Sequence, residues 1–433
     1  MVLSIVIAAV TCAVMIASVL FFPRIKVGRI SFDTYWIVVL VGAAVTVATG
    51  CISVGRLWET LVGDAAINPV KILLLFLSMT ILSVFLDEVG FFRYLANKAL
   101  RLAGKDQKRM FTVIFWTVSI LTVFTSNDVI VLTFTPFLCY FAKNAHIDPK
   151  PYLIAEFVAA NTMSMTLVIG NPTNIYIATA YGVPFLDYFL VMALPTLAAA
   201  AVAYGVLLLI FHRALREPVL ATPEEVRIED KPMLIVGLTL LILATLSLIV
   251  GPYVGVPMWL VAVSAVGVLF VVTLVISVGR KRAPALLGKT LRRAPWQLVP
   301  FVLAMFVMIL ALTEQGVTDR IGEIIGARLP IWKYGFLSFL SANVINNIPM
   351  SVLYCPIIGT LPEGGRLGAM YATIVGSNLG AFLTPIGALA GIMWLSMLKR
   401  HEVKMSFGDF IKYGAAVAFP ALAAALAVLH LTI

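Results

Sequence analysis

Four clusters of polar residues interrupt long apolar stretches of this 433-residue chain. They are residues 125–128 (TSND), 161–174 (NTMSMTLVIGNPTN), 341–349 (SANVINNIP) and 376–387 (GSNLGAFLTPIG). Gly and Pro interrupt helices, and Asn, Ser and Thr supply hydrogen-bond donors and acceptors. At membrane depth, irregular backbone is tolerated only where it is buried in protein or lines a wet cavity. One such cluster is explained equally well by interhelical hydrogen bonds, but four in matched pairs indicate one midplane site at which half-helix ends point their dipoles.

Asp128 is the one acid far from any predicted membrane interface. A charge at that depth is costly and usually functional, and a buried carboxyl can bind and release a proton. Asp128 is therefore expected to carry a coupling proton or to bind a cation; the alternative is an acid that only caps and holds a hairpin tip. The residues expected to bind a solute or an ion are Ser126, Asn127, Asp128, Asn161, Thr162, Gly170, Asn171, Thr173, Asn174, Asn346, Asn347, Ser377, Asn378, Thr384 and Gly387.

Other chemistry-bearing residues give weaker signals. Glu156 follows Lys150 by six residues, which fits a membrane interface as well as a functional site, and Asp87, Glu88 and Glu314 lie at span ends, where solvation is expected. None of the four histidines is central in a span, so a histidine relay is not expected.

The cysteines and one loop pattern have simple explanations. Cys12, Cys51, Cys139 and Cys355 lie in or beside apolar segments without metal-site spacing, so neither a disulfide framework nor a bound metal is expected. Soft thiols on the second arms of the hairpins would suit a metalloid, but small apolar filler is the simpler interpretation. Residues 283–290 (APALLGKT) follow a span and a basic run rather than a buried strand, so ATP binding there is not expected.

The composition places these clusters in a membrane. Hydrophobic residues make up 61% of the chain and charged residues only 12%, against about 25% in soluble domains. Apolar stretches long enough to cross a bilayer recur throughout. Two interrupted stretches, 111–142 and 331–360, are predicted to be re-entrant hairpins. The predicted spans are 2–22, 34–54, 67–86, 152–179, 183–211, 232–250, 256–278, 296–313, 368–398 and 410–431.

The charge pattern predicts the orientation. Segments 93–109 and 280–293 each carry six Lys or Arg, whereas 251–256 carries no charge. Basic loops stay in the cytoplasm, which puts 143–151 and 214–231 inside and both termini outside. The same rule explains the net charge of +10 without nucleic acid.

The polar linker 214–231 divides the chain into 1–213 and 232–433. Each part holds five spans and one hairpin, and an odd number of spans inverts the second repeat relative to the first. Asn161 precedes Ile169-Gly170 by the spacing at which Asn378 precedes Ile386-Gly387. A constant offset also relates Pro69, Leu77, Met79, Leu86, Glu88 and Gly90 to Pro295, Leu303, Met305, Leu312, Glu314 and Gly316.

Five segments carry a family resemblance: FLDEVGFFRYLA (85–96), SNDVIVLTFTPF (126–137), RRAPWQLVPFVLAM (292–305), NNIPMSVL (346–353) and LTPIGALAGIMWL (383–395). They resemble arsenite/antimonite efflux pumps of the ArsB type. These belong to the ion transporter superfamily, together with NhaD-type sodium/proton antiporters and divalent-anion/sodium symporters. The resemblance implies an elevator mechanism, in which a transport domain holding both hairpins slides against a scaffold.

The chain departs from ArsB-type pumps at three positions, where Asn161 and Asn378 replace expected acids and Phe382 an expected lysine. Residues 169–174 (IGNPTN) are closer to the divalent-anion carriers, and Ser126-Asn127 resembles their hairpin tip, with Asp128 in place of a threonine.

The predicted function is therefore secondary transport across the inner membrane. Amides, hydroxyls and one acid, without Lys or Arg, suit a small polyol such as arsenous acid, so arsenite/antimonite efflux by proton antiport is favoured.

The alternatives are a sodium- or proton-coupled carrier of di- or tricarboxylates or other anions, and a sodium/proton antiporter. No catalytic constellation indicates an enzyme, and no cofactor is expected beyond a coupling H⁺ or Na⁺. The expected partners are a small solute, the lipid bilayer, a second copy of the chain and, for a true arsenite pump, a soluble ATPase subunit.

Overall fold

The computed structural model covers residues 1–433 and describes all of them except 23, 28–29, 64–67, 217–218, 220–225 and 282. Parts of the predicted linker 214–231 and of the basic segment 280–293 therefore lie outside the described residues, as does residue 67 at the start of an expected span.

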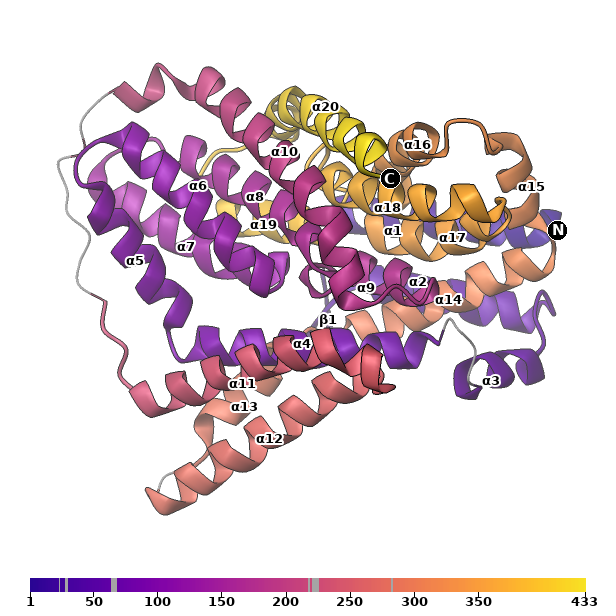
Figure 1. Ribbon diagram of the computed structural model, residues 1–433, viewed down its shortest axis with the longest axis horizontal. Coiled ribbons are helices and arrows are strands. Elements are labelled where there is room, and N and C mark those ends of the chain that lie inside the picture. Colours follow the sequence, from indigo (N-terminus) through magenta and orange to yellow (C-terminus); the bar gives the residue numbers. More distant parts are fainter. Residues whose placement is uncertain (23, 28–29, 64–67, 217–218, 220–225, 282) are drawn as a thin grey trace.

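The described chain is almost entirely helical (Figure 1). Before the linker the helices are α1 (Val2–Phe21), α2 (Thr34–Ala48), α3 (Val54–Val62), α4 (Pro69–Glu88), α5 (Phe91–Ala103), α6 (Gln107–Phe124), α7 (Asn127–Ala145), α8 (Lys150–Met163), α9 (Pro172–Ala180) and α10 (Phe185–Phe211). After it they are α11 (Lys231–Val250), α12 (Met258–Gly279), α13 (Ala285–Arg293), α14 (Leu298–Glu314), α15 (Val317–Ile325), α16 (Pro330–Ile345), α17 (Asn347–Gly359), α18 (Glu363–Gly380), α19 (Leu389–Arg400) and α20 (Phe407–Thr432).

Short elements complete the fold. The 3-10 turns η1 (Ser164–Thr166) and η2 (Val168–Gly170) separate α8 from α9, η3 (Ala214–Arg216) follows α10, and η4 (Gly251–Val254) follows α11. Two strands, β1 (Arg24–Val27) and β2 (Ile30–Asp33), pair antiparallel with Arg24 opposite Asp33. The sequence did not predict this ribbon, because its eight strand residues lack a long alternating pattern.

The all-α polytopic membrane fold is confirmed, with corrections to individual spans. Within the described residues, seven helical segments are long and apolar enough to cross a membrane. The expected span 34–54 contains only the 15-residue α2. The expected spans 152–179 and 368–398 are each divided in two, at Ser164–Asn171 and at Ala381–Ala388. Gly and Pro in these stretches end one helix and permit the next to start in a new direction.

The helices before and after the linker occur in the same order and pack reciprocally. α2 packs against α14 just as α12 packs against α4, and α10 packs along α20. α6 packs on α8, and α16 lies so close to α18 that a Cβ at Gly376 would collide with Ser338 and with the backbone of Gly335. Gly90 and Gly316, related by the predicted repeat, both begin a helix with positive φ (90° and 72°). The inverted repeat itself stays a prediction.

Ion pairs connect the parts of the chain that the linker separates, among them an exposed contact of Lys143 with Glu402 at 3.3 Å. Arg56 Nε contacts Glu314 Oε1 at 2.6 Å. Arg293 contacts Glu88 Oε1 and Asp87 Oδ2, each at 2.7 Å, and the Asp87 side chain is only 6% exposed. The expectation that span-end acids are solvated was therefore wrong for Asp87, whose side chain is almost fully buried against Arg293, whereas Glu314 is exposed as well as paired.

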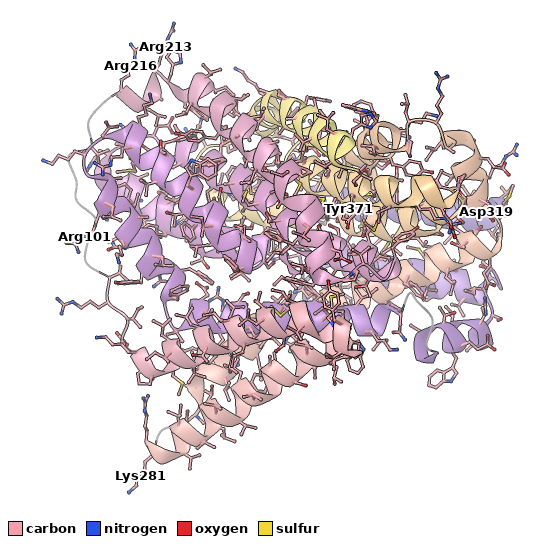
Figure 2. The ribbon with its side chains drawn as sticks, in the orientation of Figure 1. Arg101, Arg213, Arg216, Lys281, Asp319 and Tyr371 are labelled. Carbon is pink, nitrogen blue, oxygen red and sulfur yellow. The ribbon has the colours of Figure 1, made fainter. Side chains whose placement is uncertain are left out.

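Several basic side chains lie at one end of the molecule. Figure 2 shows Arg101, Arg213, Arg216 and Lys281 at that end, while Asp319 and the N-terminus lie at the opposite end. This separation agrees with the charge bias from which the cytoplasmic side was predicted.

Candidate functional site

At four helix breaks, in the two predicted hairpins and the two divided spans, the first residue of the following helix borders one cavity of about 390 Å³. These residues are Asn127 at the start of α7, Pro172 of α9, Asn347 of α17 and Leu389 of α19. A helix start carries unpaired N–H groups and the positive end of the helix dipole. Four of them around one space create a region that favours oxygen atoms and negative charge.

Local sequence explains why the helices start here. Asn171 caps α9 by accepting a hydrogen bond from Thr173 N at 3.1 Å, and Pro172 fits the first helical position. Asn346 caps α17 in the same way through Ile348 N at 3.3 Å. Ser126 lies in extended backbone between α6 and α7. The polar clusters predicted from sequence are therefore helix breaks, as expected.

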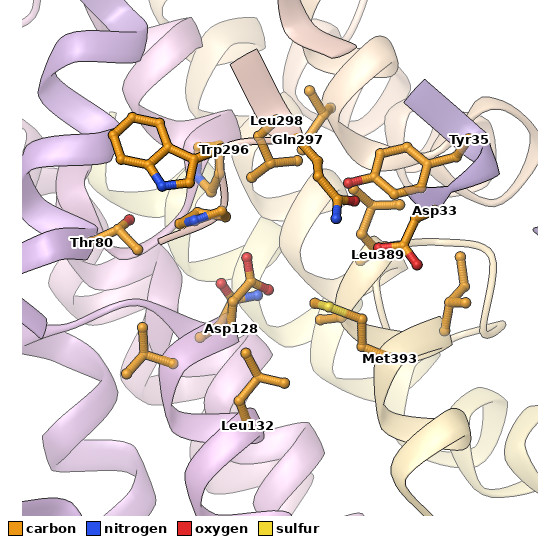
Figure 3. Close-up of a pocket in the computed structure, with 18 of the residues that line it drawn as sticks. Asp33, Tyr35, Thr80, Asp128, Leu132, Trp296, Gln297, Leu298, Leu389 and Met393 are labelled. Atoms are coloured by element: carbon orange, nitrogen blue, oxygen red, sulfur yellow. The ribbon is translucent and has the colours of Figure 1, made fainter. Parts of the chain in front are cut away.

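Asp128 lies in the first turn of α7 and faces the cavity. Figure 3 shows its carboxylate near the centre, pointing toward Trp296 and Gln297, with Leu389 and Met393 to one side. Within the described part of the chain, this carboxylate makes no hydrogen bond or ion pair. An acid that only capped the hairpin tip would bond to the tip, so the geometry favours a group available to a proton, a cation or a solute.

Asn127, the neighbour of Asp128 in the lining, has an unpartnered amide oxygen. Its Nδ2 donates to Asn161 Oδ1 at 3.1 Å, but its Oδ1 is buried without a partner, in a residue that is 2% exposed. The neighbouring Ser126 Oγ is also buried and unpartnered. Such atoms are costly unless something binds them.

Four of the predicted site residues line the cavity: Asn127, Asp128, Asn171 and Asn347. Another group lies behind the lining and is bonded within the protein. Asn378 Oδ1 accepts from Ser164 Oγ at 2.8 Å and from Asn171 Nδ2 at 3.1 Å. Asn378 Nδ2 donates to Asn174 Oδ1 at 2.7 Å. Asn378 and Asn174 thus position the α8–α9 break rather than face the cavity.

The second hairpin tip is bonded to the α18–α19 break. Asn346 Nδ2 donates to the Ile386 carbonyl, and Asn347 N donates to the Gly387 carbonyl, both at 3.0 Å. Thr384 donates to Asn343 Oδ1 through both its backbone N and its hydroxyl, at 3.0 and 2.7 Å. Asn343 was missing from the predicted set, although it lies inside the cluster 341–349.

The remaining predicted residues are buried and do not line the cavity. Thr173 bonds to Asn171, and Gly170 lies against the Ser164 carbonyl, where a Cβ would not fit. Thr162 Oγ1 and Ser377 Oγ are buried without a partner. Cys139 and Cys355 are also buried away from the lining, so their thiols do not face the cavity.

Sequence reasoning missed the basic rim, the name used here for Arg24, Arg292 and Arg293 of the cavity wall. Arg24 pairs with Asp33 at 3.0 Å and Arg293 with the end of α4, whereas Arg292 makes no ion pair in the described chain. The expectation of a site without Lys or Arg was therefore wrong for the rim. Other lining residues that were not predicted include Tyr35, Thr80, Trp296, Gln297, Met393 and Ser396.

Glu156 lies outside the cavity lining and is fully buried (0% exposed). Thr135 Oγ1 lies 3.1 Å from both of its carboxyl oxygens, and Trp394 Nε1 lies 3.3 Å from Oε2. This burial excludes the interfacial interpretation that the sequence left open.

Comparisons with known proteins agree with a transporter. A family model described as "Citrate transporter" matches residues 34–371. An arsenical pump membrane protein of Escherichia coli is 28% identical over 377 residues, covering 82% of this chain and 85% of that protein. An arsenical pump membrane protein of Yersinia enterocolitica is also 28% identical, over 82% of this chain and 85% of that protein. An uncharacterized transporter of Mycobacterium tuberculosis is 25% identical over 91% of this chain and 92% of its own.

Two solved structures share the fold. The Alcanivorax borkumensis YdaH transporter matches with a TM-score of 0.58 and 15% identity, over 99% of this chain and 97% of that chain. Neisseria gonorrhoeae MtrF, described as an antimetabolite efflux pump, matches with a TM-score of 0.53 and 13% identity, over 99% of this chain and 94% of that chain.

Proposed function

Because this chain belongs to the citrate transporter family, which makes it a membrane transporter, we propose that it exports arsenite or antimonite across the inner membrane in exchange for protons. The observation that carries the proposal is the unpaired Asp128 carboxylate in a cavity bordered by four helix starts. The arsenical pump relatives, similar over most of their length, support this substrate.

The lining fits a small solute with several hydroxyl groups. Arsenous acid is a neutral trihydroxide at neutral pH. Its O–H groups can donate to the Asp128 carboxylate and, after a side-chain shift that exposes it, to Asn127 Oδ1, while its oxygen atoms accept from N–H groups at the helix starts. Each such hydrogen bond contributes roughly 0.5–1.5 kcal/mol net, so several are needed for useful affinity.

Asp128 carries the proton in this scheme. A proton arriving from outside binds the carboxylate and neutralises it, which favours release of the hydroxyl-rich solute on that side. The neutral cavity then returns to the cytoplasmic side and releases the proton, and the restored carboxylate accepts the next solute. Solute and proton thus use the same acceptor oxygens in turn, which couples their movements in opposite directions.

An anion carrier is the second candidate, favoured by a different observation. The four helix starts and the unpaired Arg292 at the basic rim all favour negative charge, as a di- or tricarboxylate would require. The family model that matches the chain is itself described by citrate transport.

Transport into everted membrane vesicles decides between the two. In this orientation export appears as uptake, and an acidic lumen supplies the proton gradient. We expect uptake of arsenite that an uncoupler abolishes, that sodium leaves unchanged, and that exceeds uptake of succinate. Gradient-dependent uptake of succinate with none of arsenite would replace the proposal by the anion carrier.

Thermal stabilisation of the purified protein gives an independent answer, since a ligand that binds only the folded state raises the apparent unfolding temperature. Arsenite should stabilise without sodium. Stabilisation by succinate in sodium, with none by arsenite, would contradict the arsenite proposal.

A further inference from the structure

Glu156 is a buried acid that the proposed transport cycle does not use. It comes from α8, its hydrogen-bond partner Thr135 from α7, and its partner Trp394 from α19. The carboxyl group therefore joins the two broken-helix regions that lie on opposite sides of the linker. Aromatic rings pack around Trp394. The ring centroids of Phe157 and Phe410 lie 5.0 and 5.7 Å from that of Trp394.

No positive charge balances this carboxyl within the described residues. Its hydrogen-bond partners are neutral, and the Cys139 thiol lies one turn beyond Thr135 on α7. No charged residue of these helices forms an ion pair with Glu156 within the described residues; these residues are Lys150 on α8, Asp128 and Lys143 on α7, Lys399 and Arg400 on α19, and Asp409 and Lys412 on α20. A fully buried carboxylate with only neutral donors is costly, whereas the neutral acid is not.

The hydrogen-bond geometry accommodates the neutral acid. The Thr135 hydroxyl has one proton, yet its oxygen lies 3.1 Å from each carboxyl oxygen of Glu156. Both contacts are full hydrogen bonds when the hydroxyl donates to one carboxyl oxygen and the other, protonated oxygen donates back to it. Trp394 Nε1–H donates to Oε2, which makes Oε1 the oxygen suited to hold the proton.

We propose that Glu156 is a second proton-binding site, which in its protonated form holds α7 and α8 against α19. Loss of the proton to water leaves a carboxylate that needs hydration, and water can reach it only if α19 moves away from α7 and α8. The proton-binding part stands whatever the transported solute is, and only its link to transport rests on the proposed function.

This site is placed to influence the cavity. Thr135 follows Asp128 by seven residues on α7, or roughly 10 Å along the helix at 1.5 Å per residue. α19 contributes Leu389, Met393 and Ser396 to the cavity lining, and Trp394 follows Met393 directly. Separation of α19 from α7 at Glu156 would therefore change the distance between two walls of the cavity.

Infrared difference spectroscopy of the purified full-length protein, titrated from acidic to alkaline pH without any solute, tests the proton site. The wild type and Asp128→Asn should both show the carbonyl band of a buried protonated carboxyl, and Glu156→Gln should lose it. Glu363→Gln, an exposed acid on α18, is the control and should retain the band. A band unchanged in Glu156→Gln would overturn the proposal.

Two further variants keep the test decisive if Glu156→Gln fails to fold. Thr135→Val keeps the side-chain shape and removes the hydroxyl, so the band should shift in frequency. Trp394→Phe should abolish the part of the pH-dependent tryptophan fluorescence change that follows the Glu156 band. If neither variant alters the band or the fluorescence, the proton site is wrong. Failed arsenite transport with an intact Glu156 band would contradict the proposed function alone.

Discussion

The helix breaks at Ser126 and Asn346 are built from similar residues, Ser-Asn-Asp in one and Asn-Asn-Ile in the other. At the break before α17, the side chain of Asn346 and the backbone of Asn347 are bonded to the α18–α19 break. At the break before α7, a single side-chain bond, from Asn127 to Asn161, reaches the broken helix α8.

The backbone differs in the same sense. Asn346 adopts φ 72° and ψ 152°, a region that a residue with a Cβ adopts only under strain, whereas Ser126 lies in ordinary extended backbone at φ −105° and ψ 142°. The hydrogen bonds of the second tip hold that conformation. The first tip needs no such support, and Asn127 Oδ1 and the Asp128 carboxylate have no hydrogen-bond partner within the described residues. The first tip is suited to bind a solute and a proton in turn, and the second is suited to hold the shape of the cavity.

The largest effect is expected at the first tip, from Asp128→Asn. This change keeps the shape of the side chain and removes its proton-accepting charge. Proton-driven arsenite uptake into everted vesicles should fall to the level of vesicles without the protein, while thermal stabilisation by arsenite largely persists. Asp319→Asn, an exposed acid on α15, should transport normally. Unchanged gradient-driven uptake in Asp128→Asn would remove this residue as the proton carrier.

At the second tip, Asn346→Ala should act on stability instead. It removes the bond to the Ile386 carbonyl and places an alanine at positive φ, at a combined cost of about 2–4 kcal/mol. Thermal unfolding in detergent measures this loss. Asn346→Gly is the matched control, because glycine accepts the backbone and should recover about 1 kcal/mol. Equal unfolding temperatures for the two variants would show that the backbone is not strained.

Asn127→Ala should weaken solute binding more than it weakens the fold. Loss of one hydrogen bond to the solute reduces affinity about 2- to 12-fold, at about 0.5–1.5 kcal/mol. The unfolding temperature should fall less than in Asn346→Ala, because within the described residues the Asn127 side chain makes one hydrogen bond and that of Asn346 makes two. Titration of thermal stabilisation with arsenite gives the affinity. A larger loss of arsenite affinity in Asn346→Ala and a larger fall in unfolding temperature in Asn127→Ala would show that the second tip binds the solute and the first stabilises the fold.

The smallest effect is expected at the basic rim. Arg292→Gln should leave arsenite affinity unchanged, because the solute is neutral. If the carrier handles a carboxylate, half-saturation should rise by less than about 5-fold, the range of an exposed charge pair, and the rise should vanish at high salt. Lys281→Gln, distant from the cavity, is the control. A salt-sensitive loss of arsenite affinity in Arg292→Gln would show that the anionic form is transported.

Sequence patterns predicted the helix breaks and the special position of Asp128, because both depend on short stretches of residues. Gly, Pro and Asn interrupt a helix wherever they occur, and an acid inside an apolar stretch is visible without a structure. The patterns could not show that the Asn378 side chain is hydrogen-bonded to Ser164, Asn171 and Asn174. Those bonds depend on which of many amide groups meet after folding.

The same limit applies to Glu156 and to the basic rim. The burial of Glu156 depends on Trp394, which is 238 residues away in the sequence. Arg292 belongs to a basic segment whose charge is fully explained by membrane orientation, so nothing local separates a rim residue from an anchoring one. The helices α3 and α13 have nine residues each, too short to cross a bilayer, so a search for apolar spans passes over them.

The reciprocal ion pairs have a consequence for how the protein is made. Glu88 leaves the ribosome 205 residues before its partner Arg293, and Arg56 leaves it 258 residues before Glu314. At synthesis rates of about 5–20 residues per second, α4 waits roughly 10 to 40 s in the membrane before its partner helices emerge. During that interval the α4 face that later packs on α12 is covered by lipid or by an insertion factor. Assembly of the first half therefore finishes only when the second half arrives, and a ribosome stalled within 232–292 would leave a nascent chain with an acidic helix end exposed to quality control.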